Sequence, residues 1–338
     1  MTDIAPGRDN PRNSEGAFLT VEDGLLFVYS RFTGSHAEDY TSADLAAIRS
    51  RDGENWSEPT IIVRASEEGA MNVMSLSLLR MRDGAIGLFY LSRKSWTDMP
   101  VYLRLSRNEG RIWSEARRVT RPERYVVMNN DRVVRLSTGR ILISLAWHDN
   151  RMIGDRLDFA PAKTVFVYSD DDGLTWRESP QVLALPGSAS GLQEPGLVEL
   201  RSGRLYGFAR TDKGMQYTFF SEDGGESWTA PAPSAFLSPL SPLSMKRMCD
   251  GRLLAIWNPY KDWEPVTFGR TTLVWAVSAD EGASWSDPEV LEADAGAGFC
   301  YTAILPQKHR ILLSYCAGSE KDGSCLNRLR IREMAIPE

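Results

Sequence analysis

The chain has 338 residues, of which 42% are apolar and 25% are charged, the ordinary balance of a globular protein with a substantial core. Its formal net charge of −6 and pI near 5.4 argue against nucleic acid or an anionic membrane as a partner, because both attract basic surfaces. The first residues lack the apolar segment of a signal peptide, and no apolar run reaches the roughly 18 to 20 residues of a membrane span. We therefore expect a cytoplasmic protein, unless a secretion signal has been removed.

The chain contains six successive hairpin signals, each an apolar strand, a turn that usually contains glycine, and a second apolar strand. They begin at Ala17, Ser75, Arg132, Gly196, Leu243 and Thr302. A polar loop and a third apolar strand follow each hairpin, and in the first five units a short fourth strand comes next. The resulting repeat predicts an all-β fold: a six-bladed β-propeller with four-stranded antiparallel blades, forming a single domain over residues 1–338.

The sixth unit lacks a convincing fourth strand. We expect the residues before Arg12 to supply it and to close the ring.

Between the third and fourth strands lies a turn of pattern S-x-D-x-G-x-[ST]-W, complete at Ser169–Trp176, Ser221–Trp228 and Ser278–Trp285. Degenerate copies end at Trp56 and Trp113, so that the five tryptophans follow one another at intervals of 57, 63, 52 and 57 residues. The Asp side chain can accept backbone N–H bonds within its own turn while Trp packs the turn onto its blade, which favours a structural role. A calcium loop is the alternative, but it needs further oxygen ligands.

The four cysteines, Cys249, Cys300, Cys316 and Cys325, have no CxxC spacing and predict neither a zinc site nor a redox pair. We expect buried free thiols, and no metal, nucleotide or redox cofactor.

Polar groups recur at the opposite end of the blades, where the innermost strands begin. The six segments concerned are 12–16, 72–74, 129–131, 193–195, 239–241 and 299–301. The ends of the second strands add a further set of side chains to this central funnel: Arg31, Arg93, His148, Arg210, Asn258 and Cys316. Several arginines in one funnel favour an anionic ligand such as a carboxylate, although a salt bridge at the rim is the ordinary role of any single arginine.

The repeated turns resemble the Asp boxes of sialidases (neuraminidases), and the resemblance runs over essentially the whole chain. It implies a six-bladed propeller in which three arginines clamp the carboxylate of a terminal acidic sugar, a Tyr paired with a Glu is the nucleophile, and an Asp is the general acid/base. Sialidases differ from most glycosidases in using a tyrosine nucleophile.

In the second half of the chain, the family's Glu falls on Glu194 in EPGLVELRSGRL and its second arginine on Arg210 in GFARTDKG. The third arginine falls on Arg270, which opens the strand leading into SADEGASW, and the tyrosine falls on Tyr301 in GFCYTAIL. The resemblance therefore implies Tyr301 and Glu194 as catalytic residues and Arg210 and Arg270 as substrate ligands.

The first half departs from the family pattern. The first arginine maps to Arg12 in PRNSEG, where the family has R-I-P, and the neighbouring Glu15 has no counterpart. The general acid falls in the loop GSHAEDYTSAD, where Asp39 is our choice over Asp44; His36 and Glu38 lie beside it.

Four further residues of the funnel are expected to contact substrate: Arg31, Glu15, Asn130 and Asp131. Trp96, Trp147 and Trp263 lie in loops on this face and are candidates for stacking on sugar rings.

Three functional hypotheses follow. The first is a retaining exo-glycosidase of sialidase type. The second is a related propeller glycosidase that uses two carboxylates, Glu15 and Glu194, on another sugar. The third is a carbohydrate-binding propeller without catalysis. All three expect a carbohydrate partner, and the sequence does not define the oligomeric state.

Overall fold

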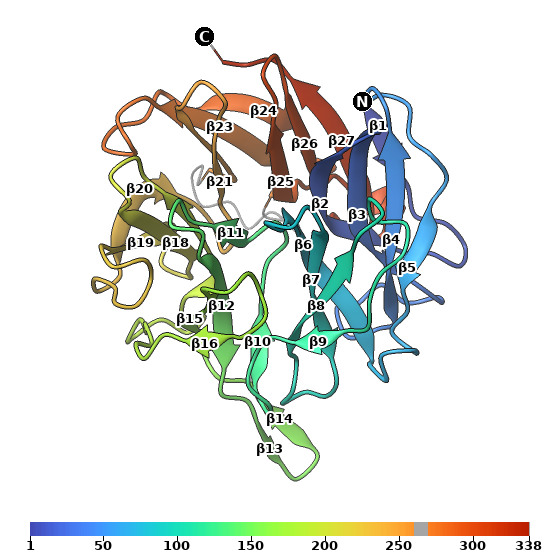
Figure 1. Ribbon diagram of the computed structural model, residues 1–338, viewed down its shortest axis with the longest axis horizontal. Coiled ribbons are helices and arrows are strands. Elements are labelled where there is room, and N and C mark those ends of the chain that lie inside the picture. The colour runs from blue at the N-terminus through green and yellow to red at the C-terminus, as the bar shows by residue number, and fades with distance from the viewer. Residues whose placement is uncertain (260–269, 338) are drawn as a thin grey trace.

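The computed structural model describes residues 1–259 and 270–337, which form six antiparallel sheets arranged in a ring around a central axis (Figure 1). Each sheet is one blade, with one edge strand near the axis and the other at the rim. The predicted six-bladed propeller with four-stranded antiparallel blades is therefore confirmed. None of the described residues belongs to a helix long and apolar enough to cross a membrane.

The first two blades have four strands each. Blade one contains β2 (Asn13–Val21), β3 (Gly24–Phe32), β4 (Ala43–Ser50) and β5 (Thr60–Val63). Blade two contains β6 (Asn72–Arg80), β7 (Ile86–Arg93), β8 (Val101–Ser106) and β9 (Arg117–Arg118).

Blades four and five repeat this order. Blade four contains β17 (Gln193–Glu199), β18 (Leu205–Arg210), β19 (Met215–Ser221) and β20 (Ala232–Leu237). Blade five contains β21 (Ser244–Arg247), β22 (Leu253–Trp257), β23 (Thr272–Ser278) and β24 (Glu289–Ala293).

Blade six is completed by the other end of the chain, as predicted. It contains β25 (Cys300–Pro306), β26 (Ile311–Cys316), β27 (Leu329–Met334) and the N-terminal β1 (Thr2–Ile4). The strands β1 and β27 pair antiparallel, and the guanidinium of Arg330 forms an ion pair with Asp3 at 2.9 Å. This pairing joins the two ends of the chain and closes the ring.

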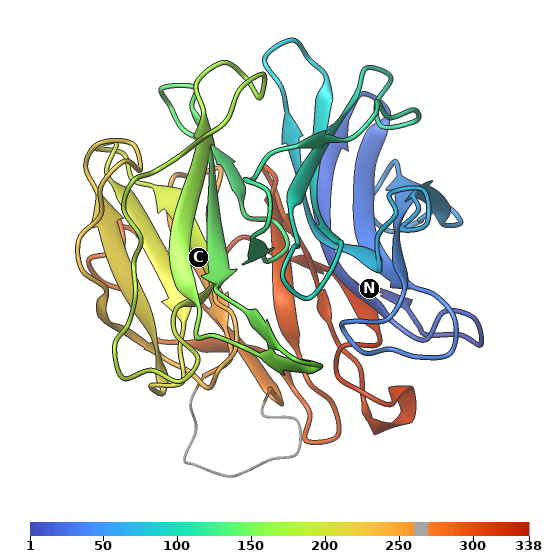
Figure 2. The same ribbon diagram turned by 90° about the horizontal axis from the view of Figure 1, so that it is seen from below.

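Blade three departs from the prediction because its innermost strand is divided. It contains β10 (Tyr125–Val127), β11 (Val133–Arg135), β12 (Ile141–His148), β15 (Lys163–Ser169) and β16 (Arg177–Glu178), and both β10 and β11 pair with β12. A separate hairpin, β13 (Arg151–Ile153) and β14 (Arg156–Asp158), occupies the following loop, where the sequence indicated only a variable connection. Figure 2 shows this hairpin on the same side of the ring as the short 3₁₀ helix η1 (Glu320–Asp322).

Four innermost strands share an irregularity near their first residues. Their pairing shifts register at Glu15 in β2, after Met74 in β6, at Glu194 in β17 and after Cys300 in β25. In each case a non-glycine residue has positive φ: Glu15 (52°), Ser75 (49°), Glu194 (45°) and Tyr301 (59°). Asp131, in the gap between β10 and β11, has a φ of 60°. Such bulges redirect side chains at the end of a strand.

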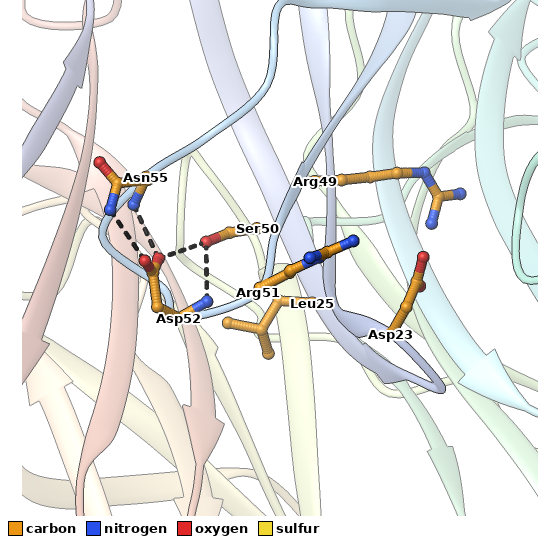
Figure 3. A pocket seen from close by; sticks show the side chains of 7 residues that line it. All are labelled: Asp23, Leu25, Arg49, Ser50, Arg51, Asp52 and Asn55. Carbon is orange, nitrogen blue, oxygen red and sulfur yellow. Dashed lines mark hydrogen bonds between the residues drawn. The ribbon is translucent and has the colours of Figure 1, made fainter.

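The Asp-box turns are held together by their own side chains. In blade three, Asp171 accepts hydrogen bonds from the hydroxyl of Ser169 at 2.8 Å and from the backbone N–H of Thr175 at 2.8 Å. Figure 3 shows the shorter turn of blade one, where Asp52 accepts bonds from Ser50 and from Asn55. These aspartates have the structural role that the sequence predicted.

The tryptophan that ends a box packs the turn onto the blade. Trp228 is buried, stacks on Phe166 with ring centroids 4.0 Å apart, and contacts the edge of Phe219 at 5.4 Å. Its indole N–H donates to the carbonyl of Gly225 at 3.1 Å. One side chain thus closes the box and fills the core between blades three and four.

We expect Trp228→Ala to lower the free energy of unfolding by about 3–5 kcal/mol, because it opens a large cavity and removes the bond to Gly225. Leu174→Ala is the control: Leu174 lies in the neighbouring box but is 71% exposed, so its loss should cost less than about 0.5 kcal/mol. Chemical denaturation of both variants measures the difference. Similar denaturation midpoints would show that Trp228 does not stabilise the fold in this way.

Candidate active site

A cavity of about 270 Å³ lies where blades one, two, three, four and six approach the axis. Two kinds of side chain line it. The polar group is Glu15, Asp39, Ser75, Gln193, Glu194, Arg210 and Tyr301. The other part of the wall is largely aromatic and aliphatic and includes Tyr40, Met74, Trp96, Met99, Tyr125 and Phe159 around Arg93. A concave site with an apolar wall and a few convergent polar groups is typical of small-molecule recognition.

Tyr301 and Glu194 meet in the polar part of the cavity. The hydroxyl of Tyr301 donates to Oε1 of Glu194 at 3.2 Å, and Nη2 of Arg210 forms an ion pair with the same oxygen at 3.1 Å. Nη1 of Arg210 also lies 3.5 Å from the hydroxyl of Tyr301. The bulges of β17 and β25 bring these side chains together, although Glu194 and Tyr301 belong to different blades. Burial, followed by the charge of Glu194, raises the pKa of Tyr301 above its ordinary value, so the resting phenol is protonated.

Arg12 organises the carboxylates of blade one. It is 1% exposed, and its Nη1 donates to Asp39 at 2.6 Å and to the carbonyl of Ala37 at 3.1 Å. Its Nη2 forms a longer ion pair with Glu15 at 3.4 Å. The hydroxyl of Ser75 donates to the other oxygen of Glu15. Arg12 thus joins the loop of Asp39 to the innermost strand of the blade.

The two carboxyl groups held by Arg12 have opposite pKa shifts. Burial raises the pKa of Glu15 to about 7, and the attraction of Arg12 only partly offsets it. Desolvation opposes the ionisation of Asp39, but the charge and hydrogen bond of Arg12 outweigh it and lower the pKa of Asp39. Its side chain remains 63% exposed. The cavity therefore contains one carboxyl that exchanges its proton near neutral pH and one that is ionised there.

Of the three arginines of the expected clamp, only Arg210 lines the cavity. Arg12 is engaged by Asp39 and Glu15. The guanidinium carbon of Arg270 lies 5.3 Å from the centroid of the Tyr301 ring, and its Nη1 donates to the sulfur of Cys300 at 3.0 Å. The described structure thus has Arg210 in the wall, whereas the guanidinium groups of Arg12 and Arg270 are bonded to other protein groups.

Several other expected contacts lie outside the cavity wall. Asn130 bridges the carbonyls of Gly16 and Tyr301 at 2.7 and 3.2 Å, which gives it a role in holding the ring together. Asp131 forms an ion pair with Lys246 at 2.9 Å and accepts the backbone N–H of Ile304.

Two further candidates from blade one are also absent from the wall. Arg31 pairs in register with Asp44 across β3 and β4. Asp44 itself is buried and accepts the backbone N–H of Ala65 at 2.9 Å, so it stabilises the blade. Asp39, in contrast, lines the cavity.

Of the three candidate tryptophans, Trp96 lines the cavity. Trp147 instead lies under the guanidinium of Arg124, 4.4 Å from the ring centroid. Trp263 is outside the described residues.

Among the aromatic residues around Arg93, the sequence proposed only Trp96 as a ligand contact. Tyr40 and Tyr125 lie in a loop and at the start of a short strand, and Phe159 directly follows the unpredicted hairpin β13–β14. Arg93 was one of the funnel residues at the ends of second strands, and that position was the only signal for it. Within residues 1–259 and 270–337, no group of three or more His, Cys, Asp or Glu side chains is arranged to hold a metal ion.

The ring of six sheets and its axial cavity define a six-bladed propeller with a concave polar site. The chain belongs to the BNR repeat-like domain family, which it matches over residues 27–313. No curated protein sequence matches it significantly.

Solved structures share this fold at low sequence identity. A protein of unknown function from Dyadobacter fermentans has a TM-score of 0.76 and 18% identity, covering 99% of this chain and 98% of that one. The intramolecular trans-sialidase from Ruminococcus gnavus, in complex with oseltamivir carboxylate, has a TM-score of 0.72 and 14% identity over 99% and 98% of the two chains. The NanB sialidase from Streptococcus pneumoniae has a TM-score of 0.72 and 12% identity, with 98% of this chain covered and 69% of that one. These likenesses establish the fold.

The raised pKa of Glu15 predicts a pH-dependent stability. Because the native carboxyl holds its proton up to about pH 7 while an unfolded glutamate releases it near pH 4.5, the native state binds more protons between these values. The free energy of unfolding of the wild type should therefore fall between about pH 4.5 and 7, by about 3 kcal/mol relative to Glu15→Gln.

Thermal and chemical unfolding at pH 5 and pH 8 measure this difference. The exposed Glu115→Gln is the control and should show the pH profile of the wild type. Parallel profiles for the wild type and Glu15→Gln would contradict the assigned protonation of Glu15.

Proposed function

We propose that the protein is a retaining exo-glycosidase of sialidase type that releases a terminal acidic sugar. The observation that carries this proposal is the hydrogen bond from Tyr301 to Glu194, with Arg210 against both, in the wall of a cavity that Asp39 also lines. A neutral phenol suits an anionic sugar, because a carboxylate nucleophile would be repelled by it. The sialidases among the structures of the same fold support the proposal by analogy alone.

The two displacement steps use these groups in turn. Tyr301 attacks the anomeric carbon while its proton passes to Glu194, and the bond to the leaving oxygen breaks as Asp39 donates a proton to it. Water then attacks the anomeric carbon of the glycosyl–tyrosine, Asp39 takes the proton of that water, and Glu194 returns its proton to the departing phenolate. The high pKa of Tyr301 is compatible with this sequence because the phenol loses its proton only as it attacks.

Asp39 must be protonated before the first step, whereas Arg12 favours its ionised form. A bound anionic group that attracts Arg12 would weaken this pairing and raise the proton affinity of Asp39. Substrate binding would then favour the protonated form of Asp39 that the first step requires.

A second candidate function is favoured by Glu15. It lines the same cavity as Glu194, the charge of Glu194 contributes to its raised pKa, and that pKa of about 7 is suited to a general acid at neutral pH. A glycosidase using Glu15 as acid and Glu194 as its partner carboxylate would act on another sugar and would not need the hydroxyl of Tyr301.

Turnover of fluorogenic glycosides separates the two functions. For the sialidase-type mechanism, Tyr301→Phe should lower kcat on an α-sialoside by roughly 10³-fold or more, because it removes the nucleophile. Glu15→Gln should leave a substantial part of the rate. Tyr29→Phe is the matched control, since it removes a buried hydroxyl that lacks a hydrogen-bond partner and lies outside the cavity wall.

A covalent probe gives an independent readout. One solved sialidase of the same fold, from Trypanosoma rangeli, is described as a covalent intermediate with 2,3-difluorosialic acid. Treatment of this protein with that compound should add one sugar to the peptide containing Tyr301, as measured by mass spectrometry. Full activity of Tyr301→Phe together with loss of activity in Glu15→Gln would replace the first function by the second, and ligand binding without turnover across a broad glycoside panel would exclude both.

A further inference from the structure

Arg93 occupies an unusual position in the aromatic part of the cavity. It is the last residue of β7, its side chain lines the cavity, and the residue is only 5% exposed. Its guanidinium carbon lies 5.5 Å from the ring centroid of Trp96 and 5.5 Å from that of Tyr125. These two cation–π contacts fix the position of the guanidinium between the rings.

The charge of Arg93 lacks the partner that the other guanidinium groups of the site have. Arg12 is paired with Asp39 and Glu15, and Arg210 with Glu194. Across residues 1–259 and 270–337, no carboxylate forms an ion pair with Arg93, and its buried Nε has no hydrogen-bond partner. A desolvated charge without a partner is costly, so an anionic group placed beside this guanidinium would be stabilising.

Asp39 does not supply this partner. Arg93 contributes to lowering the pKa of Asp39, so the two groups interact electrostatically. The short hydrogen bond of that carboxylate, however, is made with Arg12 at 2.6 Å. The donors of Arg93 consequently remain available on the cavity side.

We propose that Arg93 binds an oxyanion carried by the sugar, either a carboxylate or a sulfate ester, in the aromatic part of the cavity. The planar guanidinium presents parallel N–H groups that match two oxygens of such a group. The surrounding rings exclude water and thereby strengthen the charged contact. The inference rests on the proposed function only in taking the ligand to be a sugar.

The aromatic rings give this subsite a second contribution. Tyr40 packs on Trp96 with centroids 5.9 Å apart, and Phe159 lies against Tyr125 at 6.2 Å. The carbon framework that bears the oxyanion can therefore rest on apolar faces while its charge meets Arg93. A neutral sugar would use those faces but leave the guanidinium unpaired, so the site selects for an acidic substituent.

Calorimetric titration with matched ligands tests the proposal directly. The carboxylate pair is methyl β-D-glucuronide and methyl β-D-glucoside, and the sulfate pair is N-acetylglucosamine 6-sulfate and N-acetylglucosamine. The wild type should bind at least one acidic member more tightly than its neutral counterpart, and the pair that shows the larger ratio identifies the oxyanion. Equal binding of acidic and neutral members in both pairs would overturn the inference.

Two variants then assign the effect to Arg93. Arg93→Met keeps an unbranched stem without charge and should weaken binding of the preferred acidic ligand by about 10- to 100-fold, the range expected for a hydrogen bond to a charged group. Its neutral partner should bind as before. Arg93→Lys keeps the charge without the planar fork and should recover part of the loss, which also guards against a Met variant that fails to fold.

Arg124→Met is the matched control, because Arg124 also lies over an indole ring but is paired with Glu178 and is absent from the cavity wall. It should bind both members of each pair as the wild type does. Unchanged affinity of Arg93→Met for the acidic ligands would overturn the inference even if Tyr301→Phe abolishes turnover. Conversely, Arg93-dependent binding without turnover of any glycoside would uphold the subsite and exclude the proposed catalysis.

Discussion

The site depends on one backbone feature, the left-handed residue at the start of the innermost strands. Glu15, Ser75, Glu194 and Tyr301 all have positive φ at register shifts in their blades. This conformation costs a non-glycine residue of order 1 kcal/mol or more, and a regular strand would avoid it. It places the side chains against one another across blades, as in the bond from Ser75 to Glu15 and that from Tyr301 to Glu194. The strained backbone at these positions thus allows side chains from different blades to meet near the axis.

The meeting of these side chains brings charged groups close together, and the ion pairs and burial of each carboxyl group determine its protonation state. Arg12 is bonded closely to Asp39 and more distantly to Glu15, so one carboxyl is held ionised while burial keeps the other protonated up to about pH 7. Two carboxyls with divergent pKa values in one cavity are suited to different roles in proton transfer. Arg93 is the exception among the guanidinium groups of the wall, because aromatic rings and not carboxylates surround it. Electrostatics therefore divides the cavity into a proton-transferring part and an anion-accepting part.

The sequence predicted the propeller and its closure by the N-terminal strand because both follow from periodic signals. The Asp boxes mark blade edges, and their spacing aligned Glu194, Arg210 and Tyr301 at the other ends of the strands. The partners of Arg12 could not be predicted, because the segment 34–44 offers several acidic side chains and only its folded path brings Asp39 to the guanidinium. Phe159 was missed because hairpin β13–β14 interrupts an irregular loop. The sequence placed Arg93 in the funnel, but it could not predict that Arg93 has no carboxylate partner among the described residues, because that depends on which side chains the fold brings beside it.

Closure of the ring also assembles the site. Glu15 and Tyr301 come from the first and last blades. The side-chain amide of Asn130 links the two strands by donating hydrogen bonds to the backbone carbonyls of Gly16 and Tyr301. The pairing of β1 with β27 completes the blade that carries Tyr301. A partly folded chain with an open ring would therefore have the Asp boxes of its formed blades but not the cavity. Only the closed ring presents the whole binding surface. Any ligand that binds this cavity therefore stabilises the closed propeller relative to open forms by mass action, and with it the pairing of β1 and β27.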